Sequence, residues 1–289
     1  MIVVLDSDAQ VAGGRLATHT VATAFRTDTG KQVWGPVEVP GPIQGLGLIF
    51  ADTPKAIVSV DAASRVMLNA SDGSVVADES TTGDVQIDYE SNGVGLIRID
   101  GELQAMDTRT SLTLWNSTSL PRPDGTDSTW SAGVDETVET SRGDVVFLRW
   151  TAPDGEWVTA AHNARTGNFL GSIPGGLIPA TVESPSRNRI VEASMPAPAT
   201  TILTALDPDE GILWAKNVSG TVTLESASDN KLYLRNGAQG VALTLDSGDE
   251  LARGDFAVPR AVLADGTAIL PTGNQSKYLL ARPTPKDRQ

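Results

Sequence analysis

A phrase of twelve residues occurs six times along this chain, and its spacing restricts the folds that the sequence can adopt. Each copy has an alternating apolar run, then a polar turn, then a second short apolar run. The copies are TAFRTDTGKQVW (23–34), VMLNASDGSVVA (66–77), QAMDTRTSLTLW (104–115), AAHNARTGNFLG (160–171), TALDPDEGILWA (204–215) and VALTLDSGDELA (241–252). Alternation is typical of half-buried strands, so each copy predicts a β-hairpin.

The turn of each phrase has a glycine, or once a serine, at a fixed place. A hairpin turn needs a positive φ there, which glycine adopts at little steric cost. The residues are Gly30, Gly73, Ser111, Gly167, Gly211 and Gly248. The intervals between these positions are 43, 38, 56, 44 and 37 residues, most of them near 41. Such an interval has room for four short strands and three turns.

Helical periodicity is nearly absent, and two further strand-like runs separate successive hairpins, as in 221–237. Four-stranded repeats of this length are typical of β-propellers, whose blades are arranged radially. We therefore predict an all-β fold, a seven-bladed β-propeller of four-stranded antiparallel blades, as one domain over 1–289. The approximate units are 1–40, 41–80, 81–119, 120–175, 176–219, 220–257 and 258–289.

The first and last units each lack one strand in this interpretation. The run IVVLDS reads as the second strand of its blade, and 259–283 supplies three strands. An open ring would expose strand edges, so we expect ring closure to complete both terminal blades. The missing first strand also leads us to expect that an export signal or anchor was removed from the N-terminal side.

The repeat x-A-x-D-x-x-T-G-x-x-x-W resembles that of pyrroloquinoline-quinone-type β-propellers, the quinoprotein alcohol dehydrogenase-like group. This group also includes the propeller lipoprotein of the outer-membrane β-barrel assembly machinery. The resemblance covers nearly the whole chain, with degenerate individual motifs. Three copies have a tryptophan at or next to the last position, Trp34, Trp115 and Trp214, and the others have Ala77, Gly171 and Ala252 there. The resemblance implies that these tryptophans start the outer strands and pack toward the neighbouring blade.

The same resemblance raises a quinone-dependent oxidoreductase as the enzyme alternative. In that class the quinone lies over a Ca²⁺ and, in many members, against a disulfide of adjacent cysteines. This chain has no cysteine. Its acidic clusters, at 6–8, 207–210 and 246–250, coincide with turns, where aspartate is favoured in any case. We therefore predict a non-catalytic member of the group, with no catalytic residue and no cofactor.

We expect no metal site, because the two histidines, His19 and His162, stand alone in the sequence. Acidic residues outnumber basic ones by 36 to 22, and the net charge of −14 disfavours nucleic acid as a partner, because it repels phosphate groups. No apolar run approaches the roughly 18 residues that span a bilayer. The N-terminus lacks the basic and apolar regions of a signal peptide. We expect an extracytoplasmic protein, periplasmic, secreted or anchored, with a cytoplasmic location as the alternative.

The 56-residue interval is the main departure from the repeat. It places about 15 extra residues in 116–143, a connection that we expect on the same face as the hairpins 8–19 and 151–156. Loops on a rigid scaffold are where binding sites tend to lie, and Arg and Trp are enriched at binding hot spots. The candidate partner-binding residues are Pro121, Arg122, Pro123, Trp130, Trp150 and Trp157.

From these features we expect a monomeric, non-catalytic binding or scaffold propeller. Its ligand would be a protein or a cell-envelope component in a bacterium. The alternatives are a degenerate quinoprotein-type oxidoreductase and the extracellular sensor domain of a membrane receptor or kinase.

Overall fold

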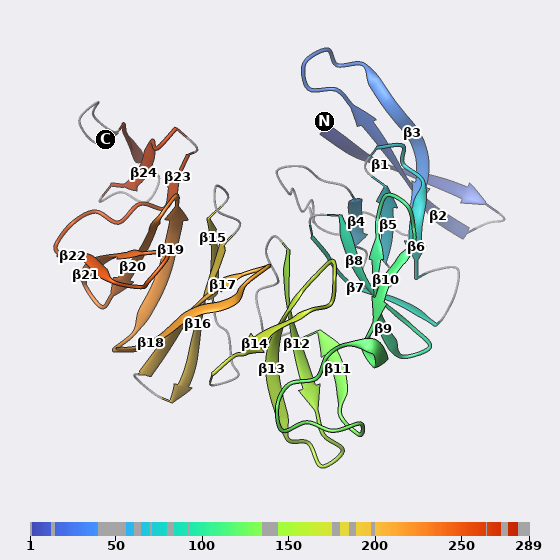
Figure 1. The fold of residues 1–289 in the computed structure, drawn as a ribbon. Helices are drawn as coiled ribbons and strands as arrows, with labels where there is room; N and C mark the ends of the chain where they lie inside the picture. Colours follow the sequence, from blue (N-terminus) through green and yellow to red (C-terminus); the bar gives the residue numbers. More distant parts are fainter. Residues whose placement is uncertain are drawn as a thin grey trace. The chain divides into compact units, whose positions relative to one another are not determined.

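A computed structural model of the chain shows an all-β architecture (Figure 1). It describes residues 2–12, 15–39, 56–60, 65–69, 71–79, 84–91, 93–134, 144–174, 180–184, 189–197, 200–263, 265–272 and 277–282. The strands in these ranges form seven separate antiparallel sheets in which consecutive strands pair. Four sheets have four strands and three have three. Within the same ranges no helix is long and apolar enough to span a membrane.

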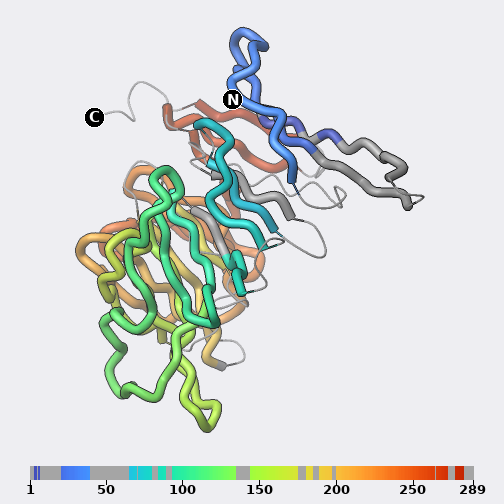
Figure 2. Tube along the Cα trace, turned by 90° about the vertical axis from the view of Figure 1, so that its right-hand side faces the viewer, coloured from blue at the N-terminus to red at the C-terminus, as the bar shows by residue number. Residues whose placement is uncertain are grey.

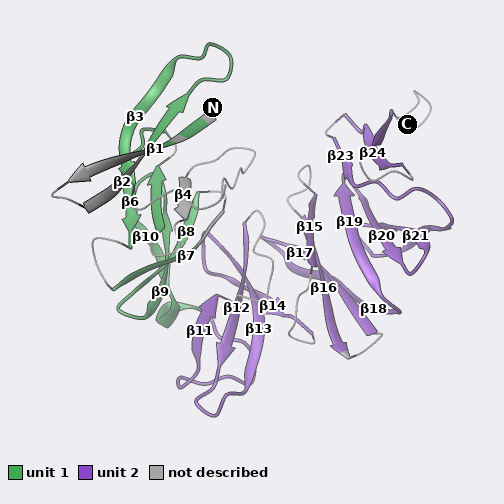
Figure 3. Ribbon diagram, turned by 180° about the vertical axis from the view of Figure 1, so that it is seen from behind, with its two compact units in different colours: residues 1–120 green, residues 121–289 purple. Residues whose placement is uncertain are grey.

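The chain divides into two compact units, coloured separately in Figure 3. Unit 1, Met1–Leu120, contains the sheets β1–β3, β4–β6 and β7–β10. Its elements are β1 (Ile2–Ala12), β2 (Arg15–Phe25), β3 (Gln32–Val39), β4 (Ala56–Val60), β5 (Arg65–Asn69), β6 (Val75–Asp78), β7 (Val85–Ser91), β8 (Val94–Ile99), β9 (Glu102–Asp107), β10 (Thr113–Asn116) and the 3-10 turn η1 (Ser117–Ser119). Buried apolar residues join each sheet to the next, for example Trp34 to Val66 and Leu68.

Unit 2, Pro121–Gln289, contains the sheets β11–β14, β15–β18, β19–β22 and β23–β25. Its strands are β11 (Ser131–Val134), β12 (Val145–Thr151), β13 (Trp157–Asn163), β14 (Phe169–Ser172), β15 (Ala180–Ser184), β16 (Arg189–Ala197), β17 (Thr200–Asp207), β18 (Gly211–Ser219), β19 (Val222–Ser228), β20 (Lys231–Asn236), β21 (Gln239–Thr244), β22 (Glu250–Gly254), β23 (Ala261–Val262), β24 (Ala268–Pro271) and β25 (Tyr278–Ala281). Phe147 packs with Ile190 and Leu206 between its first two sheets.

The six predicted hairpins are present, and they join β2–β3, β5–β6, β9–β10, β13–β14, β17–β18 and β21–β22. All six turn residues have a positive φ, from 56° at Ser111 to 88° at Gly211. The successive antiparallel meanders of three or four strands are those of an all-β propeller.

Each hairpin places a small or flexible residue opposite the first part of its outer strand. The pairs are Ala24–Trp34, Met67–Ala77, Ala105–Trp115, Ala161–Gly171, Ala205–Trp214 and Ala242–Ala252. Trp34 and Trp115 are buried, and Trp214 is half-buried. The Trp34 ring lies against Gly73 of the next hairpin, where a Cβ would approach to 2.5 Å. Trp214 lies against Gly248 in the same way, at 3.0 Å. These tryptophans therefore fill the space between neighbouring sheets.

The predicted hairpin 8–19 corresponds to the paired ends of β1 and β2. Its residues up to Ala12, and from Arg15 onward, continue β1 and β2, and the register is unbroken to the pair Ala12–Arg15.

Candidate functional site

The candidate binding residues gather around the sheet β11–β14. Pro121, Arg122, Pro123 and Trp130 lie in the segment before β11, Trp150 lies near the end of β12, and Trp157 starts β13. In Figures 1 and 2 the loop 121–130 and the hairpin 151–156 lie at the same end of this sheet. The segment 8–19 belongs to unit 1, and residues 135–143 of the long connection lie outside the described residues.

The loop 121–130 is held together by its own hydrogen bonds. The Thr126 amide donates to the Pro123 carbonyl at 3.2 Å, and the Trp130 amide donates to the Asp127 carbonyl at 3.2 Å. Hydrogen bonds from the Thr129 hydroxyl and amide lower the pKa of the Asp127 carboxyl. Pro123 is buried and Trp130 is half-buried. The loop therefore has a defined conformation of its own.

Arg122 connects this loop to the sheet through hydrogen bonds and a contact with Trp150. Its Nη1 donates to the carbonyl oxygens of Asp127, at 2.6 Å, and Trp130, at 3.0 Å. Its guanidinium carbon lies 5.2 Å from the ring centroid of Trp150, a cation–π geometry. The side chain is half-buried, so Arg122 orders the loop more than it offers a contact to a partner.

Trp150 continues this contact into the interior, where it meets His162. The tryptophan is 1% exposed, and its Nε1 lies 3.4 Å from Nε2 of His162. Nδ1 of His162 lies 3.1 Å from the Gly167 carbonyl, and the imidazole packs edge-on against Phe169. Burial lowers the pKa of His162 to about 4. The imidazole is therefore uncharged. Its Nδ1–H donates to the Gly167 carbonyl, and its Nε2 accepts from the Trp150 indole.

Trp157 is the large aromatic side chain of this site that faces solvent. It is 43% exposed, and the guanidinium of Arg149 stacks on its ring at 4.4 Å from the centroid. Trp157 pairs with Thr151 and Arg149 pairs with Thr159 across β12 and β13. The site thus presents an exposed indole with a cation stacked on it, next to an ordered loop.

The exposed residues at this end of the sheet are aromatic, polar and charged. Among the residues that the structure describes, no group of three or more His, Asp or Glu side chains is placed to hold a metal ion. His162, the one histidine in the site, is buried with both ring nitrogens engaged. Stacking, hydrogen bonding and charge are what the exposed residues can supply.

Sequence reasoning missed Glu192, a fully buried carboxyl on β16. It pairs with Thr204 on β17, and neither carboxylate oxygen makes a hydrogen bond among the described residues. Burial raises the pKa of Glu192 to about 8, and the nearby Thr204 hydroxyl acts in the opposite direction. The equivalent register positions in three other sheets hold Ile97, Leu148 and Leu234. Aligning the second strands of the repeats would have revealed this exception.

No protein-family model and no curated protein matches the chain. Among solved structures, the crystal structure of BamB from Moraxella catarrhalis is 13% identical, covers 93% of this chain and 82% of its own, and has a TM-score of 0.40. The β-propeller domain of Cps50 (Swd1) from Myceliophteria thermophila is 10% identical, covers 97% of each chain and also has a TM-score of 0.40. At these values neither similarity carries an argument about function.

Proposed function

We propose that this chain is a non-catalytic binding or scaffold propeller that contacts its partner with the loop end of the sheet β11–β14. The observation that carries the proposal is the exposed Trp157 with Arg149 stacked on it. Tryptophan and arginine are the residue types most enriched at binding hot spots. Packing inside the sheet does not account for an indole of which 43% faces solvent.

The order of the neighbouring loop supports the same proposal. A partner that binds a flexible loop loses affinity to the cost of ordering it. Here Arg122 already holds the loop 121–130 against Trp150, and the Asp127 turn closes it internally. A partner would therefore meet a surface that is formed in advance.

The scaffold in this proposal is a closed, monomeric ring of seven blades. What supports it is that both terminal sheets, β1–β3 and β23–β25, have three strands, one fewer than each sheet from β7 to β22. Each terminal sheet would complete the other. The partner would be a protein or cell-envelope component in an extracytoplasmic compartment, and the net charge of −14 disfavours nucleic acid.

The test compares the parent chain with Trp157→Ala. Both are immobilised and exposed to envelope extract from the organism of origin, and captured proteins are identified and titrated. We expect Trp157→Ala to weaken the affinity for the captured partner by about tenfold or more, as truncation of a hot-spot tryptophan does.

Leu251→Ala is the matched control, because Leu251 is an apolar side chain of similar exposure, 52%, on β22. It should keep the parent's affinity, and all three proteins should have the same melting temperature. Equal affinities of Trp157→Ala and the parent for every captured protein would exclude this end of the sheet as the binding surface.

A further inference from the structure

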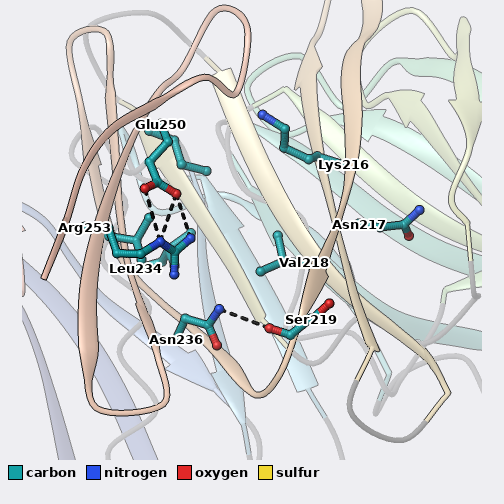
Figure 4. A pocket seen from close by; sticks show the side chains of 10 residues that line it. Lys216, Asn217, Val218, Ser219, Leu234, Asn236, Glu250 and Arg253 are labelled. Carbon is teal, nitrogen blue, oxygen red and sulfur yellow. Dashed lines mark hydrogen bonds and ion pairs between the residues drawn. The ribbon is translucent and has the colours of Figure 1, made fainter.

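A pocket of ≈ 410 Å³ lies between β18 and the sheet β19–β22 (Figure 4). Its size falls in the range of small-molecule sites. Its apolar floor consists of Val218, Leu234, Val241 and Leu243, and its polar rim of Lys216, Asn217, Ser219, Asn236, Glu250 and Arg253. It lies in unit 2, on elements other than those of the proposed binding surface.

The pocket exists because the space between these two sheets is closed at both ends and not in the middle. At one end the Trp214 ring packs on Gly248, and its Nε1 donates to the Leu245 carbonyl at 2.8 Å. At the other end Asn236 Nδ2 donates to the Ser219 carbonyl at 3.0 Å. Between them the half-buried Val218 packs against buried leucines and valines, and the pocket lies beside it.

The rim of the pocket is cationic although the chain as a whole is acidic. Lys216 Nζ donates to the Gly248 carbonyl at 2.6 Å, which uses one of its three hydrogens. Arg253 donates to Glu250 from Nε and Nη2, and its Nη1 makes no hydrogen bond with the described residues. Two cations thus accompany one carboxylate, in a chain whose net charge is −14.

We propose that this pocket binds an aliphatic carboxylate, with the apolar tail against Val218 and the carboxylate between Lys216 and Arg253. An apolar floor with a few convergent polar groups suits such a ligand, and a guanidinium with a free Nη1 suits a carboxylate. A free fatty acid and the C-terminus of a peptide that ends in leucine share this chemistry. The site does not depend on the function proposed above.

The experiment is isothermal titration of the full chain with four probes. Octanoate and N-acetyl-glycyl-leucine carry the carboxylate, and octanamide and N-acetyl-glycyl-leucinamide are their neutral counterparts. We expect at least one carboxylate to bind with a dissociation constant on the order of 1 mM or tighter, as ligands of this size allow. Its amide should bind about tenfold more weakly. Binding of octanoate alone identifies a fatty acid as the source, and binding of the peptide alone identifies a C-terminus.

Variants separate the pocket from non-specific binding. Val218→Phe fills the gap and should abolish binding without lowering the melting temperature. Arg253→Gln changes an exposed side chain and should weaken binding about tenfold. Arg26→Gln is the matched control, because Arg26 forms a similar exposed pair with Asp28 in the turn between β2 and β3. The proposal is overturned if neither carboxylate binds the parent, or if Arg253→Gln and Arg26→Gln bind equally well.

Discussion

In four of the six hairpins, a large residue on one strand faces an alanine on the other. Where the outer strand has a tryptophan, as at Trp34 and Trp214, the opposing residue is alanine. Where the outer strand has Ala77 instead, the opposing residue is Met67, which is fully buried. Interiors are packed close to crystal density, so a small residue on one strand calls for a large one nearby.

Glu192 is the residue-scale exception, and it leads to a prediction about pH. Its carboxyl ionises near pH 4.5 in the unfolded chain and, because of burial, near 8 in the folded protein. A raised folded-state pKa gives stability that is fully present below pH 4.5 and is lost as the pH rises through about 8. We therefore expect the free energy of unfolding of the parent to fall over this window relative to that of Glu192→Gln.

The measurement is urea unfolding of both proteins at several pH values across that window. The variant also serves as the control for His162, whose pKa of about 4 applies in both proteins, so that its contribution cancels in the difference. If the two stability curves run parallel, the pKa of the Glu192 carboxyl is not raised in the folded protein.

At the scale of elements, the hairpins were predictable because their signals are local. Alternation and a turn residue lie within twelve residues, and all six hairpins follow them. Spacing from the turn glycine does not by itself predict the position of Trp214 in the hairpin. Trp214 stands three residues after Gly211, whereas Trp34 stands four residues after Gly30. A shorter turn restores its register, and it pairs with Ala205 as Trp34 pairs with Ala24.

Other features of the site depend on contacts between elements, and sequence patterns do not show these. Trp150 and Trp157 are seven residues apart, yet one is buried under Arg122 and the other is exposed beside Arg149.

The packing between neighbouring elements can be tested with two glycines that differ in one respect. Gly30 and Gly73 have similar positive φ values, 65° and 74°. A Cβ on Gly30 would meet nothing within 4 Å, whereas one on Gly73 would meet the Trp34 ring at 2.5 Å. Gly30→Ala should therefore lose about 1–2 kcal/mol from backbone strain alone. Gly73→Ala should lose about 1–3 kcal/mol more, because the indole must move.

Chemical denaturation of the two variants and the parent measures both losses. The turn strain is common to both variants, so their difference reports the contact with Trp34. Equal losses would mean that Trp34 does not pack on the next hairpin.

At the scale of the whole molecule, the repeat period predicted an all-β propeller, and seven antiparallel sheets occur within the described residues. Local sequence patterns do not predict closure of the ring. Closure joins the segments that are farthest apart in the sequence, and no local pattern signals it. The binding role proposed here needs a rigid scaffold, and an open array of sheets would leave the edges of both terminal sheets unpaired.

Cross-linking of the two terminal sheets tests this closure most directly. The chain has no cysteine, so a double variant with Val4→Cys on β1 and Leu280→Cys on β25 has two thiols, both at exposed positions, 46% and 67%. A short bismaleimide should join them within one chain at high yield and raise the melting temperature, with the single-cysteine variants as controls. If the double variant remains unlinked while both thiols react with a monofunctional maleimide, the ring is open and the seven-bladed scaffold is contradicted.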